Sequence, residues 1–451
     1  MTSRTVNILD RHFMKVFLFL PLFLLLFDLR GLAQRPNIIY IMTDDMGYGD
    51  LSCYGQKKYA TPNLDRLASQ GVKFLNAYAA APVCTPTRAA FMTGRYPART
   101  PVGLMEPLTD PKSGGAYGLT KDIPSLAILM KESGYETVLI GKWHLGFMPE
   151  QSPMKNGFDY FFGIRSGAAD YFSYRGANGA GTDVGTYDLY ENDEMVYPQG
   201  YLTDLLTQKS CDFIKQKHNK PFFLSINFNA PHWPWQGPSD KTYPDSIDFR
   251  EGGSPTVYAA MMKSLDDGIG KIMQALDDAQ LTGQTIVIFT NDNGGERYSD
   301  NGGLSNSKGT LWEGGIRVPA FVRWPGKINA GVTTQQVAVT MDWTATILKA
   351  GGAKADKGFP LDGIDLMPIL TGKKNIIDRT LYWRTFQRVK HKAMRDGKWK
   401  YLQVEEGEYL FDLSTDQGEK NDLKLKETER FEKMKEKFNR WERTVLQPIP
   451  L

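Results

Sequence analysis

The chain has 451 residues, of which 41% are hydrophobic and 23% charged, and its formal net charge is +3. This composition is typical of soluble globular proteins, and the small net charge argues against a nucleic-acid-binding surface. The length predicts one large domain with a smaller one beside it.

Residues 1–33 predict a secretory signal peptide. Lys15 precedes the apolar run Val16–Phe27, and the small residues of Gly31–Ala33 offer a cleavage site before Gln34. A membrane span needs roughly 20 apolar residues, more than this run contains. We therefore expect an exported protein, periplasmic or secreted, with no stable membrane span after signal cleavage. The alternatives are an uncleaved anchor and a true start at Met14.

Three cysteines follow this segment, Cys53, Cys84 and Cys211. An odd number in an exported protein leaves at least one of them unpaired or modified. Cys53 and Cys211 either form a disulfide or remain two buried thiols, and we favour the thiols.

Four short apolar runs predict strands that are covered on both faces. They are Asn37–Thr43, Glu136–Ile140, Phe222–Asn227 and Thr285–Thr290. Helical patterns lie between them: one helix begins at Pro62 with Thr61 as its N-cap, and others cover about Ile123–Lys131 and Tyr258–Ala279. Strands that alternate with helices predict an α/β fold, with a large, mostly parallel sheet sandwiched by helices.

Polar motifs follow all four runs. They are Asp44-Asp45, Gly141-Lys142-Trp143-His144, Pro231-His232 and Asn291-Asp292-Asn293. In open α/β sheets, ligands bind beyond the carboxyl ends of the strands. The four ends bring acids, amides, a lysine and two histidines to one edge of the sheet and therefore predict a functional site there.

The pattern changes after Gly372. Four short runs predict antiparallel strands: Thr380–Arg384, Lys392–Met394, Lys398–Val404 and Tyr409–Leu413. A charged helix over about Lys424–Val445 follows them. We expect a boundary near 372–376, between a catalytic domain (34–374) and a smaller C-terminal subdomain (375–451) with an antiparallel sheet plus a helix. Segment 166–200 is rich in Gly, Tyr, Asn and Asp and predicts a long surface loop, either functional or a mobile insertion.

The pairs Asp44-Asp45 and Asp292-Asn293 suggest a metal site. Adjacent carboxylates at a strand end are more often turn or cap residues, but here a second oxygen-bearing pair follows a parallel strand. Ligation by oxygen alone favours Ca²⁺ or Mg²⁺ over Zn²⁺.

The segment Cys84-Thr85-Pro86-Thr87-Arg88 carries the strongest signal. A helix that opens near Pro86 places Cys84 at its start, where the helix dipole and free amides favour an anion. Arg88, one turn further, is placed to hold an oxyanion with its forked guanidinium. A lone cysteine is usually a small core residue, but this spacing argues against that interpretation.

This segment, together with Thr93-Gly94-Arg95, closely resembles the signature of the type I, formylglycine-dependent sulfatases of the alkaline phosphatase-like superfamily. The resemblance extends over the following motifs: Asp44–Asp50, Gly141–Gly146, Ala230–His232, Asn291–Gly295 and Lys308–Gly315. It runs from about residue 36 to the C-terminus and is closer to arylsulfatases and N-acetylgalactosamine-6-sulfatases than to the phosphatases of the superfamily. It implies the same fold.

The resemblance also implies roles for the site residues. In that family a maturation enzyme oxidises the cysteine to Cα-formylglycine, so Cys84 is expected to become a hydrated aldehyde. One Ca²⁺ is expected, bound by the following residues: Asp44, Asp45, Asp292, Asn293 and the modified Cys84. Arg88 orients the diol, and Lys142, His232 and Lys308 hold the sulfate oxygens.

By the same resemblance, one oxygen of the diol attacks sulfur in line. His232, aided by Lys308, protonates the departing alcohol. His144 then takes the proton of the second hydroxyl, which expels sulfate and restores the aldehyde. The diol is needed because its ester can collapse by C–O cleavage.

The expected substrate is a sulfated polysaccharide or its oligosaccharides. Five aromatic residues are candidates for a sugar-stacking platform, although buried aromatic residues are more common: Trp143, Trp233, Trp235, Tyr171 and Tyr174.

Two rival functions are a phosphate or phosphonate monoesterase of the same superfamily and a non-enzymatic glycan-binding protein. The second predicts the loss of a metal ligand, the nucleophile or a base, and none of these is missing.

Overall fold

The computed structural model describes residues 1–2, 35–109, 117–178, 183–242 and 248–449. Apart from its first two residues, the predicted signal peptide (1–33) lies outside this range. Pro36–Leu451 form one compact unit, which contains all the elements named below. Within the described part of the chain, no helix is both long and apolar enough to cross a membrane.

The four strands predicted from apolar runs lie side by side in the middle of a large sheet. Their order is β10 (Thr285–Asn291), β1 (Asn37–Thr43), β9 (Phe222–Asn227) and β3 (Glu136–Gly141), and all three pairings are parallel. Every residue of β1, β9 and β10 is buried, as continuous apolar runs predict for strands covered on both faces. The predicted strand cluster is confirmed.

Further strands extend the sheet on both sides to the order β12-β2-β11-β10-β1-β9-β3-β4-β7-β8. They are β2 (Val72–Tyr78), β4 (Tyr160–Gly163), β7 (Tyr190–Glu191), β8 (Glu194–Met195), β11 (Ala320–Arg323) and β12 (Val332–Val339). β11 runs antiparallel to both β10 and β2, and the β4–β7 and β7–β8 pairings are also antiparallel. The sheet is therefore mixed but mostly parallel at its centre.

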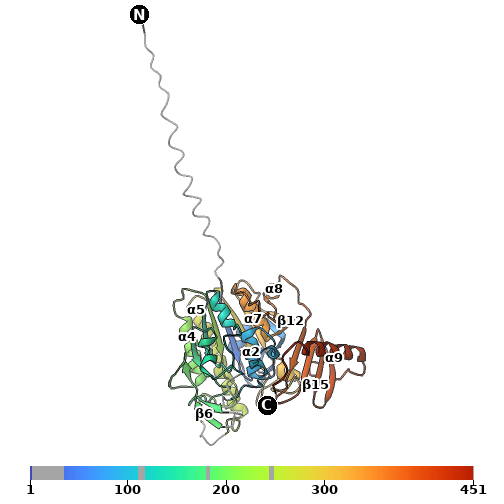
Figure 1. Cartoon of the computed structure of the whole chain (residues 1–451). Coiled ribbons are helices and arrows are strands. Elements are labelled where there is room, and N and C mark those ends of the chain that lie inside the picture. The colour runs from blue at the N-terminus through green and yellow to red at the C-terminus, as the bar shows by residue number, and fades with distance from the viewer. Residues whose placement is uncertain (3–34, 110–116, 179–182, 243–247, 450–451) are drawn as a thin grey trace. The chain divides into compact units, whose positions relative to one another are not determined.

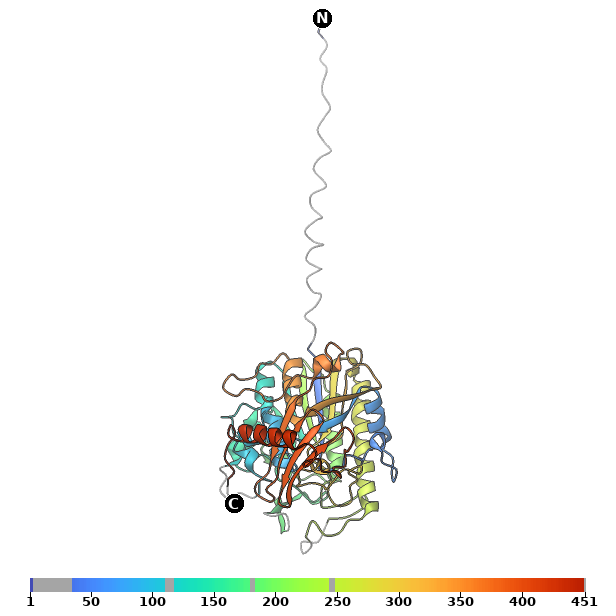
Figure 2. The ribbon, with the colours of Figure 1, turned by 90° about the vertical axis from the view of Figure 1, so that its right-hand side faces the viewer.

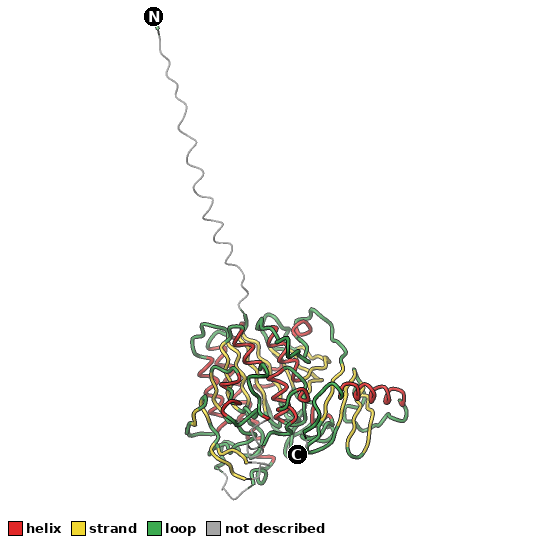
Figure 3. The backbone as a smooth tube through the Cα atoms, in the orientation of Figure 1, coloured by secondary structure: helices red, strands yellow, loops and turns green. Residues whose placement is uncertain are grey.

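Helices cover both faces of this sheet (Figures 1 and 3). On one face lie α1 (Pro62–Ser69), α4 (Leu202–Ile214) and α5 (Pro255–Asp278), which share a core with Ile39 and Ile41 of β1. The other face carries α2 (Cys84–Thr93), α3 (Leu126–Glu132) and α7 (Thr340–Ala350), which share a core with Ile38 and Tyr40. Because successive residues of β1 enter opposite cores, one strand links both layers. There are also two one-turn helices, α6 (Glu313–Ile316) and α8 (Met367–Leu370).

The start of α1 shows how tertiary contacts replace a local cap. The helix begins at Pro62, as predicted, but the hydroxyl of Thr61 makes no capping bond to its first turn. The amides of Asn63 and Leu64 instead donate to the carboxylate of Asp266 on α5, at 3.1 and 2.8 Å. The cap therefore comes from a residue about 200 positions away in the sequence.

A second, smaller sheet follows in the C-terminal part of the chain. Its four antiparallel strands are β13 (Thr380–Arg384), β14 (Lys392–Asp396), β15 (Trp399–Val404) and β16 (Gly407–Asp412). The helix α9 (Thr428–Glu442) lies across these strands (Figure 2) and buries Phe431, Met434, Phe438 and Trp441 against them. The predicted sheet plus helix is confirmed, whereas the domain boundary near 372–376 stays a prediction.

Segment 166–200 differs from the surface loop that was predicted. Ala168, Ala169 and Tyr171 are buried in the core, and the Tyr171 hydroxyl donates to the backbone carbonyls of Asn229 and His232. Two short strands, β5 (Arg175–Asn178) and β6 (Asp183–Tyr187), pair with each other, and β7 and β8 join the large sheet. Tyr171 therefore packs into the fold and supports the loop that carries His232, whereas Tyr197 of the same segment is exposed.

Buried charges join the large sheet unit to the small sheet. Lys400 of β15 and Glu313 of α6 are both fully buried, with 2.9 Å between Nζ and Oε1. Lys400 also contacts Glu419 at 2.7 Å, and Arg317 contacts the other oxygen of Glu313 at 3.3 Å. Removing one member of such a network leaves the others charged and desolvated.

We predict that Lys400→Met lowers the free energy of unfolding by about 3–5 kcal/mol, because it leaves the buried Glu313 and Glu419 without the cation that they share. Denaturant unfolding measures this loss. Lys398→Met is the matched control, because Lys398 is half exposed although its partner Asp412 is mostly buried, and we expect a change below about 1 kcal/mol. Equal losses in the two variants would contradict the prediction.

Candidate active site

The ends of β1 and β10 bring two acidic pairs together. Thr43 and Asn291, the last residues of the two strands, are directly paired, so Asp44-Asp45 and Asp292-Asn293 begin at the same level. The Asn293 amide donates to Oδ1 of Asp45 at 2.8 Å, and the backbone amide of Asp45 lies 3.4 Å from Oδ1 of Asp292. Asp44, Asp292 and Asn293 are fully buried and Asp45 nearly so.

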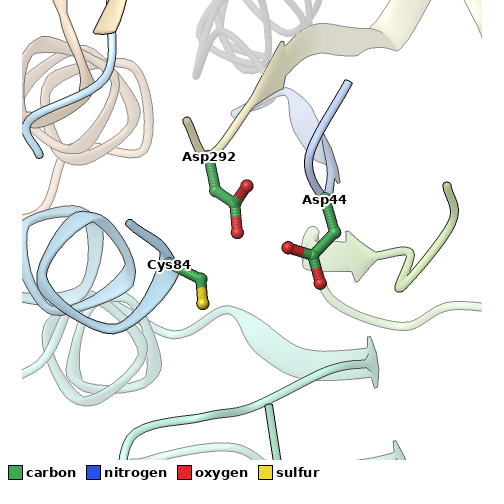
Figure 4. A group of neighbouring side chains, drawn as sticks. All are labelled: Asp44, Cys84 and Asp292. Carbon is green, nitrogen blue, oxygen red and sulfur yellow. The ribbon is translucent and has the colours of Figure 1, made fainter. Parts of the chain in front are cut away.

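Cys84 lies beside this acidic group. It is the first residue of α2, is 2% exposed, and is a free cysteine, as are Cys53 and Cys211. The sulfur and one carboxylate oxygen each of Asp44 and Asp292 lie within 4.8 Å of one another (Figure 4). Burial raises the pKa of the Cys84 thiol. Cys53 and Cys211 are two free thiols, as expected, but only Cys211 is buried, whereas Cys53 is partly exposed.

Two buried oxygens in this group lack a hydrogen-bond partner within the described residues. They are Oδ1 of Asp44 and Oδ1 of Asn293. Burial, together with the charge of Asp292, raises the pKa of Asp44 well above its ordinary value. Since buried polar atoms are normally satisfied, and oxygens are the ligands that hard cations prefer, the residues fit a bound divalent cation.

Arg88 holds one of these carboxylates. It projects from α2 one turn after Cys84, and its Nε and Nη2 donate to Oδ2 of Asp292 at 3.2 and 2.8 Å. Its Nη1 donates to the backbone carbonyl of Lys142 at 3.1 Å. One buried guanidinium thus connects the start of α2, the end of β10 and the end of β3.

Two lysines hold the other two carboxylates. Lys142 Nζ lies 2.5 Å from Oδ2 of Asp44, and Lys308 Nζ lies 2.5 Å from Oδ2 of Asp45. Burial alone would lower the pKa of Lys308, but Asp45 and Glu296 together raise it above its ordinary value. Burial likewise opposes ionisation of Asp45, yet Lys308, His232 and Asn293 lower the pKa of this carboxyl below its usual range.

Burial lowers the pKa of both histidines near this group, His144 and His232. Burial, together with the charge of Lys142, lowers the pKa of His144 well below its ordinary value, and burial lowers that of His232 against the opposing charge of Asp45. Nε2 of His144 bonds to the carbonyl of Leu108 at 2.9 Å, whereas its Nδ1 has no partner in the described structure. Because a carbonyl only accepts, the proton of His144 is assigned to Nε2, and Nδ1 is left as a proton acceptor.

The second histidine has the opposite arrangement. Nδ1 of His232 bonds to the carbonyl of Trp233 at 2.6 Å, and its Nε2 lies 3.4 Å from Oδ2 of Asp45.

Two residues of the site have an unusual backbone conformation: Asp45 and His144 both have positive φ, 64° and 54°. This conformation costs about 1–3 kcal/mol in a non-glycine residue and is concentrated at functional sites.

A pocket opens above these residues. It is lined by Val83, Cys84, Pro107, Leu108, Thr109, His144, Phe147, Gly167, Ala168, His232, Trp233, Arg250, Glu296, Lys308, Gly309 and Arg388. The structure thus brings together every residue predicted for the metal and the reaction: Asp44, Asp45, Cys84, Arg88, Lys142, His144, His232, Asp292, Asn293 and Lys308.

Residues 36–353 match the family described as Sulfatase, and residues 306–444 match the one described as N-sulphoglucosamine sulphohydrolase, C-terminal. The chain belongs to the sulfatase family. It is similar to N-acetylgalactosamine-6-sulfatase from Homo sapiens, with 35% identity over 376 residues that cover 78% of this chain and 69% of that protein. Steryl-sulfatase from Homo sapiens is 33% identical over 440 residues, which cover 79% and 74%.

The fold is similarly close to solved sulfatase structures. The structure of Ps i-CgsB in complex with k-i-k-neocarrahexaose has a TM-score of 0.82 at 31% identity, with 92% of this chain and 94% of that chain covered. The protein is therefore a sulfuric ester hydrolase with the fold that the sequence predicted.

The predicted aromatic platform of this sulfatase is mostly wrong. Trp143 is 1% exposed, and its ring N–H donates to the carbonyl of Gln151, so it is a core residue. Trp235 is 3% exposed and does not line the pocket, and Tyr171 and Tyr174 are equally buried. The sequence could not separate these rings from Trp233, which does line the pocket, because burial depends on the packing of distant segments.

Several residues of the sulfatase pocket were not predicted from the sequence. Glu296 accepts from the ring N–H of Trp233 at 3.1 Å and lies 3.5 Å from Lys308 Nζ; its place next to the Asn291–Gly295 motif was an available signal. Arg250 and Arg388 line the pocket from segments without any motif. Outside the pocket lining, His391 is buried, and its Nδ1 accepts from the amide of Leu311, three residues after Lys308.

Gly167 is a further residue without a sequence signal. A Cβ built on it would lie 2.4 Å from Cε1 of His144, closer than real Cβ contacts allow. The imidazole ring therefore occupies the space that any side chain at position 167 would need, and His144 can reach its place only because residue 167 is glycine.

We predict that Gly167→Ala displaces His144 and lowers kcat on an aryl sulfate by about 10²-fold, the scale expected for a displacement near 1 Å. Gly283→Ala is the control, because its Cβ would meet nothing within 4 Å. Steady-state kinetics with matched thermal unfolding curves would test this. An unchanged kcat in Gly167→Ala would show that the position of His144 is not critical.

Proposed function

We propose that this sulfatase hydrolyses sulfate esters of a polysaccharide or its oligosaccharides, with residue 84 as nucleophile after its conversion to formylglycine, and with one bound Ca²⁺. The single observation that carries the proposal is the convergence of Cys84, Arg88 and the two acidic pairs beneath one pocket. The resemblance of the segment Cys84–Arg88 to the family signature supports the modification.

The proposed ion is held by Asp44, Asp45, Asp292 and Asn293, with residue 84 as a further ligand. The two oxygens without partners, on Asp44 and Asn293, support this assignment. A donor set of carboxylate and amide oxygens favours Ca²⁺ over softer metals. When bound, the ion would supply positive charge that polarises a sulfate oxygen and lowers the pKa of a neighbouring hydroxyl.

The chain's own residues would then bind the sulfate and move the protons. Arg88 orients residue 84, and Lys142 and Lys308 turn from their carboxylates toward the sulfate oxygens, where they stabilise developing negative charge. His232 would take up a proton at Nε2 when the substrate binds and would deliver it to the departing alcohol, with the cationic Lys308 beside it. Nδ1 of His144, which is left as an acceptor, takes a proton from residue 84.

A carbohydrate substrate is supported by the pocket and by a neighbour. The pocket combines the ring of Trp233 with the cations Arg250, Lys308 and Arg388, which suits an anionic sugar. The similar Ps i-CgsB structure contains a hexaose, as its name states. We further propose that residues 1–33 are a cleaved export signal, that 34–374 form the catalytic domain and 375–451 a subdomain, and that a maturation enzyme acts on Cys84.

We predict that, in active protein, the mass of the tryptic peptide with Cys84 shows replacement of the thiol sulfur by an aldehyde oxygen and loss of two hydrogens. Cys84→Ser should lower kcat/KM on an aryl sulfate by more than about 10³-fold, because the nucleophile is lost. Cys53→Ser is the control and should keep both the modification and the activity. Full activity with an unmodified Cys84 would refute the assignment.

We also predict one bound Ca²⁺ per chain. An ion at 100 times its Kd should stabilise the folded chain by about 2.7 kcal/mol, so thermal unfolding of chelator-treated protein should shift upward when Ca²⁺ returns. Asn293→Leu should abolish the shift, whereas Asn293→Asp, which keeps an oxygen, should retain it. A larger shift with Mg²⁺ than with Ca²⁺ would contradict the choice of metal.

A further inference from the structure

Tyr171 is fully buried and therefore cannot stack on a sugar, but its hydroxyl contacts the backbone that carries His232. The hydroxyl oxygen lies 2.9 Å from the carbonyl oxygen of His232 and 3.0 Å from that of Asn229. From this contact we infer that Tyr171 is a positioning residue, which aligns His232 for delivery of a proton to the departing alcohol. The inference rests on the proposed function, in which His232 is the proton donor.

His232 lies at the end of a tight turn that follows β9. The amide of His232 closes this turn by donating to the carbonyl of Asn229 at 2.9 Å. The hydroxyl of Tyr171 therefore contacts the first and the last carbonyl of one turn. Between them, the carbonyl of Ala230 accepts from the amide of Asp44 at 3.2 Å. The turn is thus held between Tyr171 on one side and the acidic pair after β1 on the other.

The backbone of Tyr171 holds the other end of the same loop. Its amide donates to Oε1 of the fully buried Gln236 at 2.9 Å, so the loop 229–236 is attached to Tyr171 at both ends. Tyr171 is itself fixed by α4 and the residue before it. Its carbonyl accepts from the amide of Leu202 at 2.8 Å, and its ring stacks on that of Tyr201, with 5.2 Å between the centroids.

Packing alone does not explain the hydroxyl of Tyr171. A phenylalanine ring would keep the stacking on Tyr201, and a buried hydroxyl costs free energy unless it is hydrogen-bonded. Burial raises the pKa of Tyr171 well above its ordinary value, so the hydroxyl keeps its proton and acts as a donor. Among the described residues, both of its acceptors belong to the turn that ends at His232. The hydroxyl therefore serves the position of that turn.

The imidazole of His232 takes its position from this turn. Its Nδ1 bonds to the carbonyl of the next residue, Trp233, and so moves with the same loop. A proton donor must lie within hydrogen-bond reach of the oxygen that it protonates, and a displacement near 1 Å can lower a rate by about 10²-fold. Loss of the Tyr171 hydroxyl would leave the carbonyl of His232 without this donor and allow the turn, together with the ring, to shift.

The test is the dependence of kcat/KM on the leaving group, measured on the matured full chain with 4-nitrophenyl, phenyl and 4-methoxyphenyl sulfate. A nitrophenolate departs with little help, whereas a more basic phenolate needs a proton. Misalignment of the donor therefore steepens the plot of log kcat/KM against the pKa of the leaving phenol. A merely structural defect would reduce the amount of active enzyme, lower all three rates equally and leave this slope unchanged.

The variants are Tyr171→Phe, His232→Ala, the double variant of both, and Tyr174→Phe as the matched control. Tyr171→Phe keeps the ring and its stacking, so it removes only the hydroxyl. Tyr174 is a buried tyrosine of the same segment, and its hydroxyl donates to the carbonyl of Gly200 instead of the loop with His232. Thermal unfolding compares the stability of all variants with that of the parent protein.

We expect Tyr171→Phe to lower kcat/KM by about tenfold for phenyl sulfate but by less than about twofold for 4-nitrophenyl sulfate. His232→Ala should steepen the slope further. In that background Tyr171→Phe should leave the slope unchanged, because the effects of residues that act through one another do not add. Tyr174→Phe should keep the slope of the parent protein.

A parental slope in Tyr171→Phe, an equal steepening in Tyr174→Phe, or a further steepening in the double variant would overturn the inference. The proposed function fails differently. If His232→Ala itself keeps the parental slope, the assignment of His232 as proton donor is wrong. If His232→Ala steepens the slope while Tyr171→Phe does not, that assignment stands and only the role of Tyr171 is refuted.

Discussion

Three carboxylates are buried together where β1 and β10 end, and the rest of the site is arranged around them. Desolvated charges of one sign cost several kcal/mol each unless opposite charges reach them. Each of the three carboxylates has a cation from a different segment within 3 Å: Lys142 after β3 for Asp44, Lys308 before α6 for Asp45 and Arg88 on α2 for Asp292. Compensating this charge therefore requires that these segments converge, and their convergence creates the pocket.

Close backbone packing supports the same convergence. A Cβ on Gly294 would lie 1.8 Å from the carbonyl oxygen of Gly314, so the loops after β10 and around α6 approach as only glycines allow. Asp50 joins the loop after β1 to the same region, because its carboxylate accepts from the amides of Gly47 and Asp300. The positions of the acidic pairs are thus determined by loops that pack on one another as well as by the strands.

The small sheet takes part in this architecture. Lys400 holds Glu313, and His391 holds the amide of Leu311, both in the segment that begins with Lys308. The loop with Arg388 is bound to Glu106, close to the residue that holds His144. The C-terminal strands therefore position one lysine of the site and supply an arginine to its entrance, so they contribute to function as well as to stability.

The central strands and the polar motifs that follow them were predictable from the sequence, because buried parallel strands are continuously apolar and their ends share one edge. β12 was not recognised, since its first half is exposed and polar. The sequence alone determined which chemical groups the site contains, as these are encoded in local motifs. Only the tertiary structure decided that Trp143 is core while Trp233 faces the pocket, and that Gly167, Arg250 and Arg388 belong to it, because burial and proximity depend on contacts between residues far apart in the chain.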